Sequence, residues 1–152
     1  MRNQVTNMSR KAGVVVWRRA DNGTGTLEGT LEILLITARR HPDSWIFPVG
    51  TVDPGETLQQ AAARECAEES GYTVEVGSLL AEIIVPKEAD QTPASGTVDS
   101  QHFTFFAAQL TGELSTYETD RQRRWVSLPQ LLACIAPVFA RVARAAREVL
   151  PH

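Results

Sequence analysis

The sequence predicts an α+β fold, and three observations predict it. Runs of β-branched and aromatic residues recur along the chain with the lengths of strands. One central segment has a helix-forming composition, and a C-terminal segment repeats apolar side chains with helical periodicity. The resulting order of strand, strand, helix, strands, helix is that of a mixed α+β domain. Because 152 residues, 43% of them hydrophobic, can bury a core of their own, residues 1–152 are predicted to form a single domain.

The strands follow from the β-branched runs in chain order. They are predicted over residues 12–17, 31–37, 73–76, 79–85, 101–110 and 124–127. Between the first two, the run Asp-Asn-Gly-Thr-Gly-Thr that begins at Asp21 indicates a flexible hairpin loop. Residues 87–100 are rich in Pro, Ala, Ser, Thr and Asp and are more numerous than a hairpin needs. A surface loop and a substrate lid are both compatible with that composition.

A helix is predicted over residues 58–70, which contain four alanines and neither Pro nor Gly. The turn residues Asp-Pro-Gly at 53–55 precede it, Thr57 is a suitable N-cap, and Gly71 supplies a left-handed C-terminal position. Ala62, Ala63 and Cys66 form a face of small residues, which is expected to pack closely on the sheet.

The last predicted helix spans residues 131–150 and is interrupted near Pro137. Its arginines at positions 141, 144 and 147 recur on the outward side and indicate a solvated face. The net charge of −3 argues against a nucleic-acid partner. No apolar run has the length of a membrane span, the N-terminus lacks a secretory core, and the two cysteines have no paired spacing, so a cytoplasmic protein is expected.

The central predicted helix carries Glu65, Glu68 and Glu69 at i, i+3 and i+4, so they share one face. Carboxylates in a cluster repel each other, and a cation among them lowers that cost. An all-oxygen donor set favours a hard divalent metal. A solvated acidic face is the alternative, and Arg64, four residues before Glu68, can orient its carboxylate.

The full pattern around these acids is longer than the cluster. It consists of a glycine, a glutamate, an Arg-Glu pair, a Glu-Glu pair and a closing glycine, at positions 50, 56, 64–65, 68–69 and 71. This pattern resembles the box of the Nudix hydrolase family. The resemblance implies an α/β/α sandwich with a mixed sheet and a catalytic loop–helix–loop, and hydrolysis of the pyrophosphate bond in a nucleoside diphosphate linked to a further group.

The resemblance also implies roles for individual residues of the box. Glu65, Glu68 and Glu69 would bind Mg²⁺, or Mn²⁺ in its place, and one of them would position or deprotonate the attacking water. The carbonyl of Gly50 would join the metal shell. Glu56 and Arg64 would hold the loop against the helix and so support the motif.

A second resemblance concerns the substrate. Residues 39–48 read Arg-Arg-His-Pro-Asp-Ser-Trp-Ile-Phe-Pro, and basic residues stand at 10–11 and at 121, 123 and 124, before Trp125. These features resemble the branch that hydrolyses diadenosine and diphosphoinositol polyphosphates. The resemblance implies a long anionic small-molecule substrate, with the phosphate contacts Lys11, Arg40, Arg121 and Arg123. Val49, where this branch often has Gly or Lys, and the acidic net charge favour the dinucleotide over the inositol substrate.

Several alternatives stay open at this point. A nucleoside triphosphate pyrophosphatase shares the box, and a nucleotide-sensing domain could keep the fold without turnover. His41 fits either a stabilised turn beside Pro42 or a substrate contact. Glu88, Asp90 and Asp99 are candidates for a further metal ligand. The sequence does not separate a monomer from a homodimer.

Overall fold

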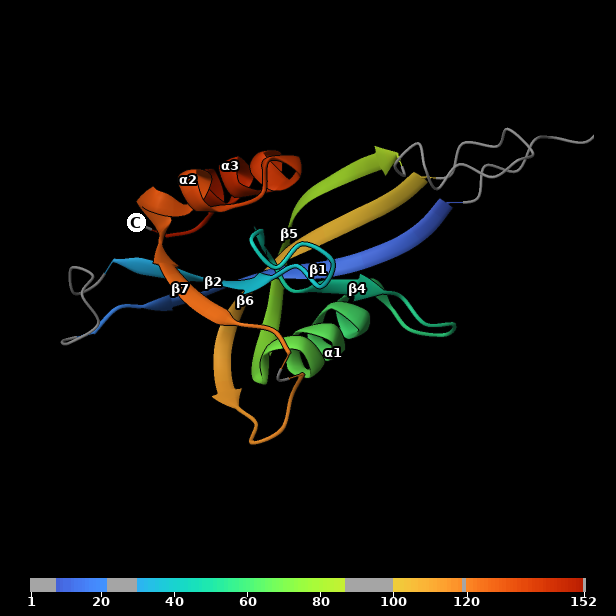
Figure 1. Ribbon diagram of the computed structural model, residues 1–152, viewed down its shortest axis with the longest axis horizontal. Coiled ribbons are helices and arrows are strands. Elements are labelled where there is room, and N and C mark those ends of the chain that lie inside the picture. Colours follow the sequence, from blue (N-terminus) through green and yellow to red (C-terminus); the bar gives the residue numbers. More distant parts are fainter. Residues whose placement is uncertain (1–7, 22–29, 87–99, 119, 152) are drawn as a thin grey trace, which may run out of the picture.

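A mixed β-sheet runs through the molecule and carries helices on both faces (Figure 1). The computed structural model describes residues 8–21, 30–86, 100–118 and 120–151. The strands are β1 (Met8–Arg19), β2 (Leu31–Thr37), β3 (Trp45–Ile46), β4 (Val49–Thr51), β5 (Tyr72–Pro86), β6 (Ser100–Glu113) and β7 (Arg123–Ser127). The helices are α1 (Leu58–Ser70), α2 (Leu131–Cys134) and α3 (Ala140–Val149), with single 3₁₀ turns at Leu128–Gln130 and Pro137–Phe139.

Strand β1 is the centre of the sheet. The strand order is β3-β2-β1-β6-β5, and β1 and β6 are parallel while the other pairs are antiparallel. On its other edge β1 divides its length between two partners. Residues 17–19 pair with β2, and residues 11–13 pair with β4, where Ala12 lies opposite Gly50. Strand β4 thus joins the sheet beside β1, and the chain continues from it into α1.

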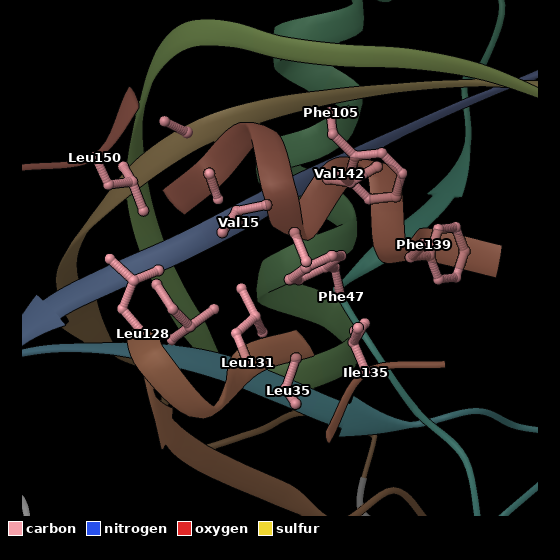
Figure 2. Packing of buried hydrophobic residues seen from close by; sticks show 14 of the residues in the cluster. Val15, Leu35, Phe47, Phe105, Leu128, Leu131, Ile135, Phe139, Val142 and Leu150 are labelled. Atoms are coloured by element: carbon pink, nitrogen blue, oxygen red, sulfur yellow. The ribbon is translucent and has the colours of Figure 1, made fainter. Parts of the chain in front are cut away.

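The sheet separates two hydrophobic cores, because successive side chains of a strand point to opposite faces. Val15 of β1 belongs to the core under α2 and α3 (Figure 2), whereas Val14 and Val16 belong to the core under α1. In the first core the ring of Phe139 packs edge-on against Phe105, with 5.4 Å between ring centroids. The α+β class and the predicted α/β/α layering are therefore confirmed.

Helix α1 begins and ends where its capping residues predict. The Thr57 hydroxyl accepts the Gln60 amide at 3.0 Å, the Gln60 side chain accepts the Thr57 amide in return, and Gly71 is left-handed at φ 77°. Cys66 is fully buried, and burial raises the pKa of its thiol to about 12, so it is unsuited to nucleophilic chemistry at neutral pH. Of the predicted packing face, Ala62 and Cys66 are buried and Ala63 is half-buried, while Ala61, which was not predicted, is fully buried.

Other elements differ from the prediction in ways that follow from their length or neighbours. The two predicted strands at 73–76 and 79–85 are one strand, β5, with irregular register near its middle. The short strands β3 and β4 were not predicted, since two or three residues show no periodicity. The C-terminal helix is divided, because Ile135 is extended and Pro137 starts a new turn.

Parts of the chain lie outside the described residues. They include most of the predicted loop that begins at Asp21 and residues 87–99, with the three candidate carboxylates Glu88, Asp90 and Asp99. Within the described ranges, none of the helices combines the length and the apolar character needed to cross a bilayer.

Candidate active site

The loop between β4 and α1 is closed onto the helix by Arg64. Its Nε and Nη2 donate to the two carboxylate oxygens of Glu56 at 2.7 and 2.9 Å, and Nη2 also donates to the Thr51 carbonyl at 3.0 Å. Glu56 in turn accepts the Asp53 amide at 2.9 Å. The hydrogen bonds from Arg64 hold the pKa of Glu56 at about 2, well below its usual range, so this pair stays ionised at any physiological pH.

Replacing Arg64 by glutamine is expected to loosen this loop. The variant loses a two-point guanidinium–carboxylate contact, so the free energy of unfolding should fall by about 2 kcal/mol. Thermal denaturation of the variant against Arg144→Gln, an exposed arginine of α3, measures the difference. A surface arginine of that kind should cost less than about 0.5 kcal/mol. Equal melting temperatures for the two variants would contradict the role of Arg64 as the clamp of the loop.

Glu65 lies directly against β4. A Cβ atom built on Gly50 would be 2.1 Å from Cδ of Glu65, closer than any real contact. The absence of a side chain at position 50 is therefore what admits the Glu65 carboxylate. Burial raises the pKa of Glu65, and Arg64, which donates to it at 3.0 Å, opposes that shift.

Glu69 is the most buried acid of the helix, with 4% of its surface exposed. The amide of Val49 donates to Oε1 at 2.9 Å, and Arg121 lies 3.3 Å from Oε2. Burial raises the pKa of Glu69 to about 8, while Arg121 lowers it and Glu65 raises it further. Both oxygens of this carboxylate are thus held by groups from outside the helix.

Glu68 is exposed, and Arg64 contacts both of its oxygens at 3.2 and 3.3 Å. Near it lies an acid that sequence reasoning missed, Glu118, whose amide donates to the Glu68 carbonyl at 2.9 Å. Its carboxylate accepts from Arg121 at 3.1 Å, and its charge contributes to the raised pKa of both Glu65 and Glu69. No local signal marks Glu118, because it reaches the acids only through the fold.

The charge among these carboxylates is already balanced in part by two guanidinium groups, those of Arg64 and Arg121. A metal ion is therefore not required to offset the whole charge of the cluster. Among the described residues, no three acidic, histidine or cysteine side chains converge as a metal site. The donor chemistry nevertheless fits a hard cation, since half-buried Glu65 and buried Glu69 bring carboxylate oxygens to β4, and Gly50 makes room for the first of them.

A cavity of about 450 Å³ lies beside Gly50, on the side of the sheet that carries α3. Its walls are mainly apolar, with Val49, Phe103 and Phe139 among them. The polar residues that line it are Lys11, His41, Ser44 and Gln101. A volume and lining of this kind are typical of a small-molecule site. Gly50 lines the cavity and also touches Glu65, so the cavity and the acids adjoin.

The predicted phosphate contacts occupy different surroundings. Lys11 lines the cavity and donates to the Thr51 hydroxyl at 2.7 Å, and Arg40 is exposed beside His41. Arg121 and Arg123 both face acceptors of the protein. The side chain of Arg121 is only 8% exposed, and Arg123 donates to the Ser70 carbonyl at 2.8 Å.

The family model of the NUDIX domain matches residues 9–152. The 8-oxo-(d)GTP phosphatase of Mycolicibacterium smegmatis is 42% identical over 79 residues, which are 51% of this chain and 24% of that protein. Diphosphoinositol polyphosphate phosphohydrolase 3-alpha of Mus musculus is 33% identical over 117 residues, 72% of this chain and 65% of that protein. The chain thus spans less than two thirds of the length of these relatives.

Solved structures share the architecture. A binary complex of the Ap4A hydrolase of C. elegans superposes with a TM-score of 0.67 at 24% identity, covering 93% of this chain and 97% of that one. The NUDIX domain of Shewanella oneidensis NrtR, complexed with ADP ribose, superposes with a TM-score of 0.69 at 19% identity, covering 97% and 91%. At these identities the likeness concerns the fold alone.

Proposed function

Because the chain belongs to the Nudix hydrolase family, we propose that it hydrolyses a pyrophosphate bond in a nucleoside diphosphate derivative with the help of a divalent metal. The observation that carries the proposal is the contact between Glu65 and Gly50. It brings a half-buried carboxylate of the box helix to the backbone of β4, beside a cavity large enough for a substrate. The family typically uses divalent metals, and we propose Mg²⁺, with Mn²⁺ as a substitute.

In this proposal Glu65, Glu68 and Glu69 hold the metal together with the carbonyl of Gly50. A bound divalent ion supplies charge to the phosphate oxygens and acidifies a water. The protein contributes position: the Val49 amide fixes one oxygen of Glu69, and Arg64 orients Glu65 and Glu68. Phosphoryl transfer depends mainly on such placement, since little covalent chemistry falls to the protein.

The cavity supports a nucleoside-containing substrate, first of all a dinucleoside polyphosphate. Phe103, Phe139 and Val49 offer apolar walls to a base, whereas an inositol polyphosphate would need several cations at the same place. Among the described residues that line this cavity, Lys11 is the one lysine or arginine. We therefore propose Lys11 as a phosphate contact, because its ammonium has donors left beside the one that the Thr51 hydroxyl accepts, together with exposed Arg40 next to His41. Arg121 and Arg123 are held by acceptors of the protein.

Replacing Lys11 by methionine tests the phosphate contact. The change keeps the length of the side chain and removes one charge-assisted contact, so KM for diadenosine tetraphosphate should rise about tenfold. Steady-state kinetics give KM and kcat separately. Arg144→Met removes one positive charge from the exposed face of α3 and should leave KM unchanged. An unaltered KM in the Lys11 variant would remove this residue from the substrate site.

The substrate class itself is tested by a hydrolysis screen with Mg²⁺ and Mn²⁺, with products resolved by chromatography. The panel comprises diadenosine polyphosphates, nucleoside triphosphates including an 8-oxo derivative, nucleotide sugars and a diphosphoinositol polyphosphate. Preference for diadenosine polyphosphates is expected. Preference for the triphosphates, with release of pyrophosphate, would instead identify a triphosphate pyrophosphatase. Metal-dependent nucleotide binding without any hydrolysis would indicate a sensing domain.

A further inference from the structure

Each nitrogen of the Arg121 guanidinium donates to a hydrogen-bond acceptor of the protein. Nε donates to Glu118 at 3.1 Å, Nη1 to the Thr37 carbonyl at 3.2 Å, and Nη2 to Glu69 at 3.3 Å. All three guanidinium nitrogens are therefore engaged, and only 8% of the side chain is exposed. A guanidinium that is satisfied in this way has a fixed direction.

The segment that carries Arg121 is attached to the end of α1 at several points. The Leu114 amide donates to the Gly71 carbonyl at 2.6 Å, and the Glu118 amide donates to the Glu68 carbonyl at 2.9 Å. Tyr117 covers Gly71 so closely that a Cβ atom there would lie 2.7 Å from its ring. Residues 114, 117 and 118 are therefore packed directly against the last turn of α1, a few positions before Arg121.

The contacts of Arg121 fix the orientation of the Glu69 carboxylate. This carboxylate is held at one oxygen by the Val49 amide of β4 and at the other by Arg121. A carboxylate that is held at both oxygens cannot turn about its terminal bond. Because Arg121 would have to leave Glu69, Glu118 and Thr37 to reach a phosphate, its geometry suits the acids better than a substrate.

We infer that Arg121 is a positioning residue, which sets the orientation in which Glu69 meets the metal, and not a substrate contact. The inference rests on the proposed function, since it assumes that the box carboxylates bind a divalent ion. A positioning role of Arg121 differs from a general structural role in one respect. The affinity for metal should depend on Arg121 more than on other residues that hold α1.

Arg123 supplies the matched control. It also anchors the end of α1, through the Ser70 carbonyl at 2.8 Å, and its guanidinium lies over the rings of Tyr72 and Tyr117 at 4.6 and 4.4 Å. Among the described contacts, however, it touches none of the box carboxylates. Arg123→Gln should therefore disturb the same region while leaving Glu69 in place.

The experiment titrates Mn²⁺ into Arg121→Gln, Arg121→Lys, Arg123→Gln and the wild type, with free Mn²⁺ read by electron paramagnetic resonance. Loss of a partner that orients a ligand typically weakens metal binding by about 10–100-fold. We expect Kd for Mn²⁺ to rise at least about tenfold in Arg121→Gln, to rise less in Arg121→Lys, and to stay within about twofold in Arg123→Gln. At saturating Mn²⁺, KM for diadenosine tetraphosphate should stay within about twofold in the Arg121 variants while kcat falls.

The opposite pattern would overturn the inference. An unchanged Kd for Mn²⁺ with a raised KM would make Arg121 a substrate contact, and an equal loss of Mn²⁺ affinity in Arg123→Gln would reduce its role to general support of α1. If Arg121→Gln does not fold, wild-type Mn²⁺ affinity in Arg121→Lys with a raised KM decides against the inference, and weaker Mn²⁺ binding supports it. Absence of Mn²⁺ binding in the wild type would overturn the proposed function as well, so the two failures are distinct.

Discussion

Replacing Glu69 by glutamine is expected to lower kcat about a thousandfold while the protein stays folded. The amide keeps the shape of the side chain and can still occupy its place under β4, but it offers a metal one neutral oxygen in place of a carboxylate. Metal stabilisation of the transferred charge contributes several kcal/mol, and each 1.36 kcal/mol is a factor of ten in rate. Single-turnover kinetics with saturating Mg²⁺ measure the loss. Glu148→Gln, an exposed acid of α3, serves as the control and should keep wild-type turnover. Turnover near that of the wild type in Glu69→Gln would overturn the assignment of this acid.

The free energy of unfolding of Glu69→Gln should change with pH differently from that of the wild type. Burial raises the pKa of Glu69 to about 8 in the folded protein, from a usual value of 4.5. Between these values the folded state binds more protons than the unfolded state, so stability falls as pH rises through this window. Glutamine does not titrate. Glu69→Gln should therefore gain on the wild type from pH 5 to pH 8, by an amount on the order of a few kcal/mol at most. Denaturant unfolding of both proteins at pH 5 and pH 8 measures the gain. A constant difference in stability across that range would contradict the raised pKa of this buried carboxyl.

Helix α1 could be predicted to the residue because its signals are local. Thr57, Gln60 and Gly71 act within one turn of the helix ends, and the spacing of Glu65, Glu68 and Glu69 determines their common face. Strand β2 was also predicted with its observed bounds, since its seven residues are all buried and mostly β-branched or Leu. Where the residues that determine an element lie within it or next to it, composition and spacing are sufficient to predict its bounds.

The surroundings of the acids could not be predicted in the same way. Arg121 and Glu69 are 52 positions apart in sequence, and Arg64 and Glu56 only eight. The second pair belongs to a motif, whereas the first depends on the contacts that residues 114, 117 and 118 make with the end of α1. The basic run before Trp125 suggested phosphate contacts, but the structure directs two of its arginines at Glu69 and at the Ser70 carbonyl. Charge in a sequence thus indicates that a partner exists without indicating whether the partner is a ligand or the protein itself.

Gly50→Ala is expected to displace the Glu65 carboxylate while lowering the stability of the fold only slightly. The new Cβ atom would lie 2.1 Å from Cδ of Glu65 and 2.3 and 2.5 Å from its two oxygens. Because these atoms end a flexible side chain, the carboxylate can swing away and β4 can keep its pairing with β1. The cost in stability should stay near the low end of overpacking, about 1 kcal/mol, while kcat and Mn²⁺ affinity should each fall about a hundredfold or more. Gly77→Ala, in β5, introduces the same methyl group 3.2 Å from the Ala107 carbonyl and should leave both quantities unchanged.

A double-mutant cycle decides whether Gly50 acts through Glu65. If the alanine at position 50 does harm only by displacing that carboxylate, it has nothing left to displace once Glu65 is alanine. The loss of kcat in Gly50→Ala/Glu65→Ala should then equal the loss in Glu65→Ala alone, a strongly non-additive result. Additive losses would mean that the glycine serves the site in some other way, for example through its own carbonyl, and that the contact with Glu65 is a consequence of close packing. Glu65→Ala also removes the hydrogen bond from Arg64, but this bond is missing in the double variant as well, so the comparison between those two proteins isolates the effect of the alanine at position 50.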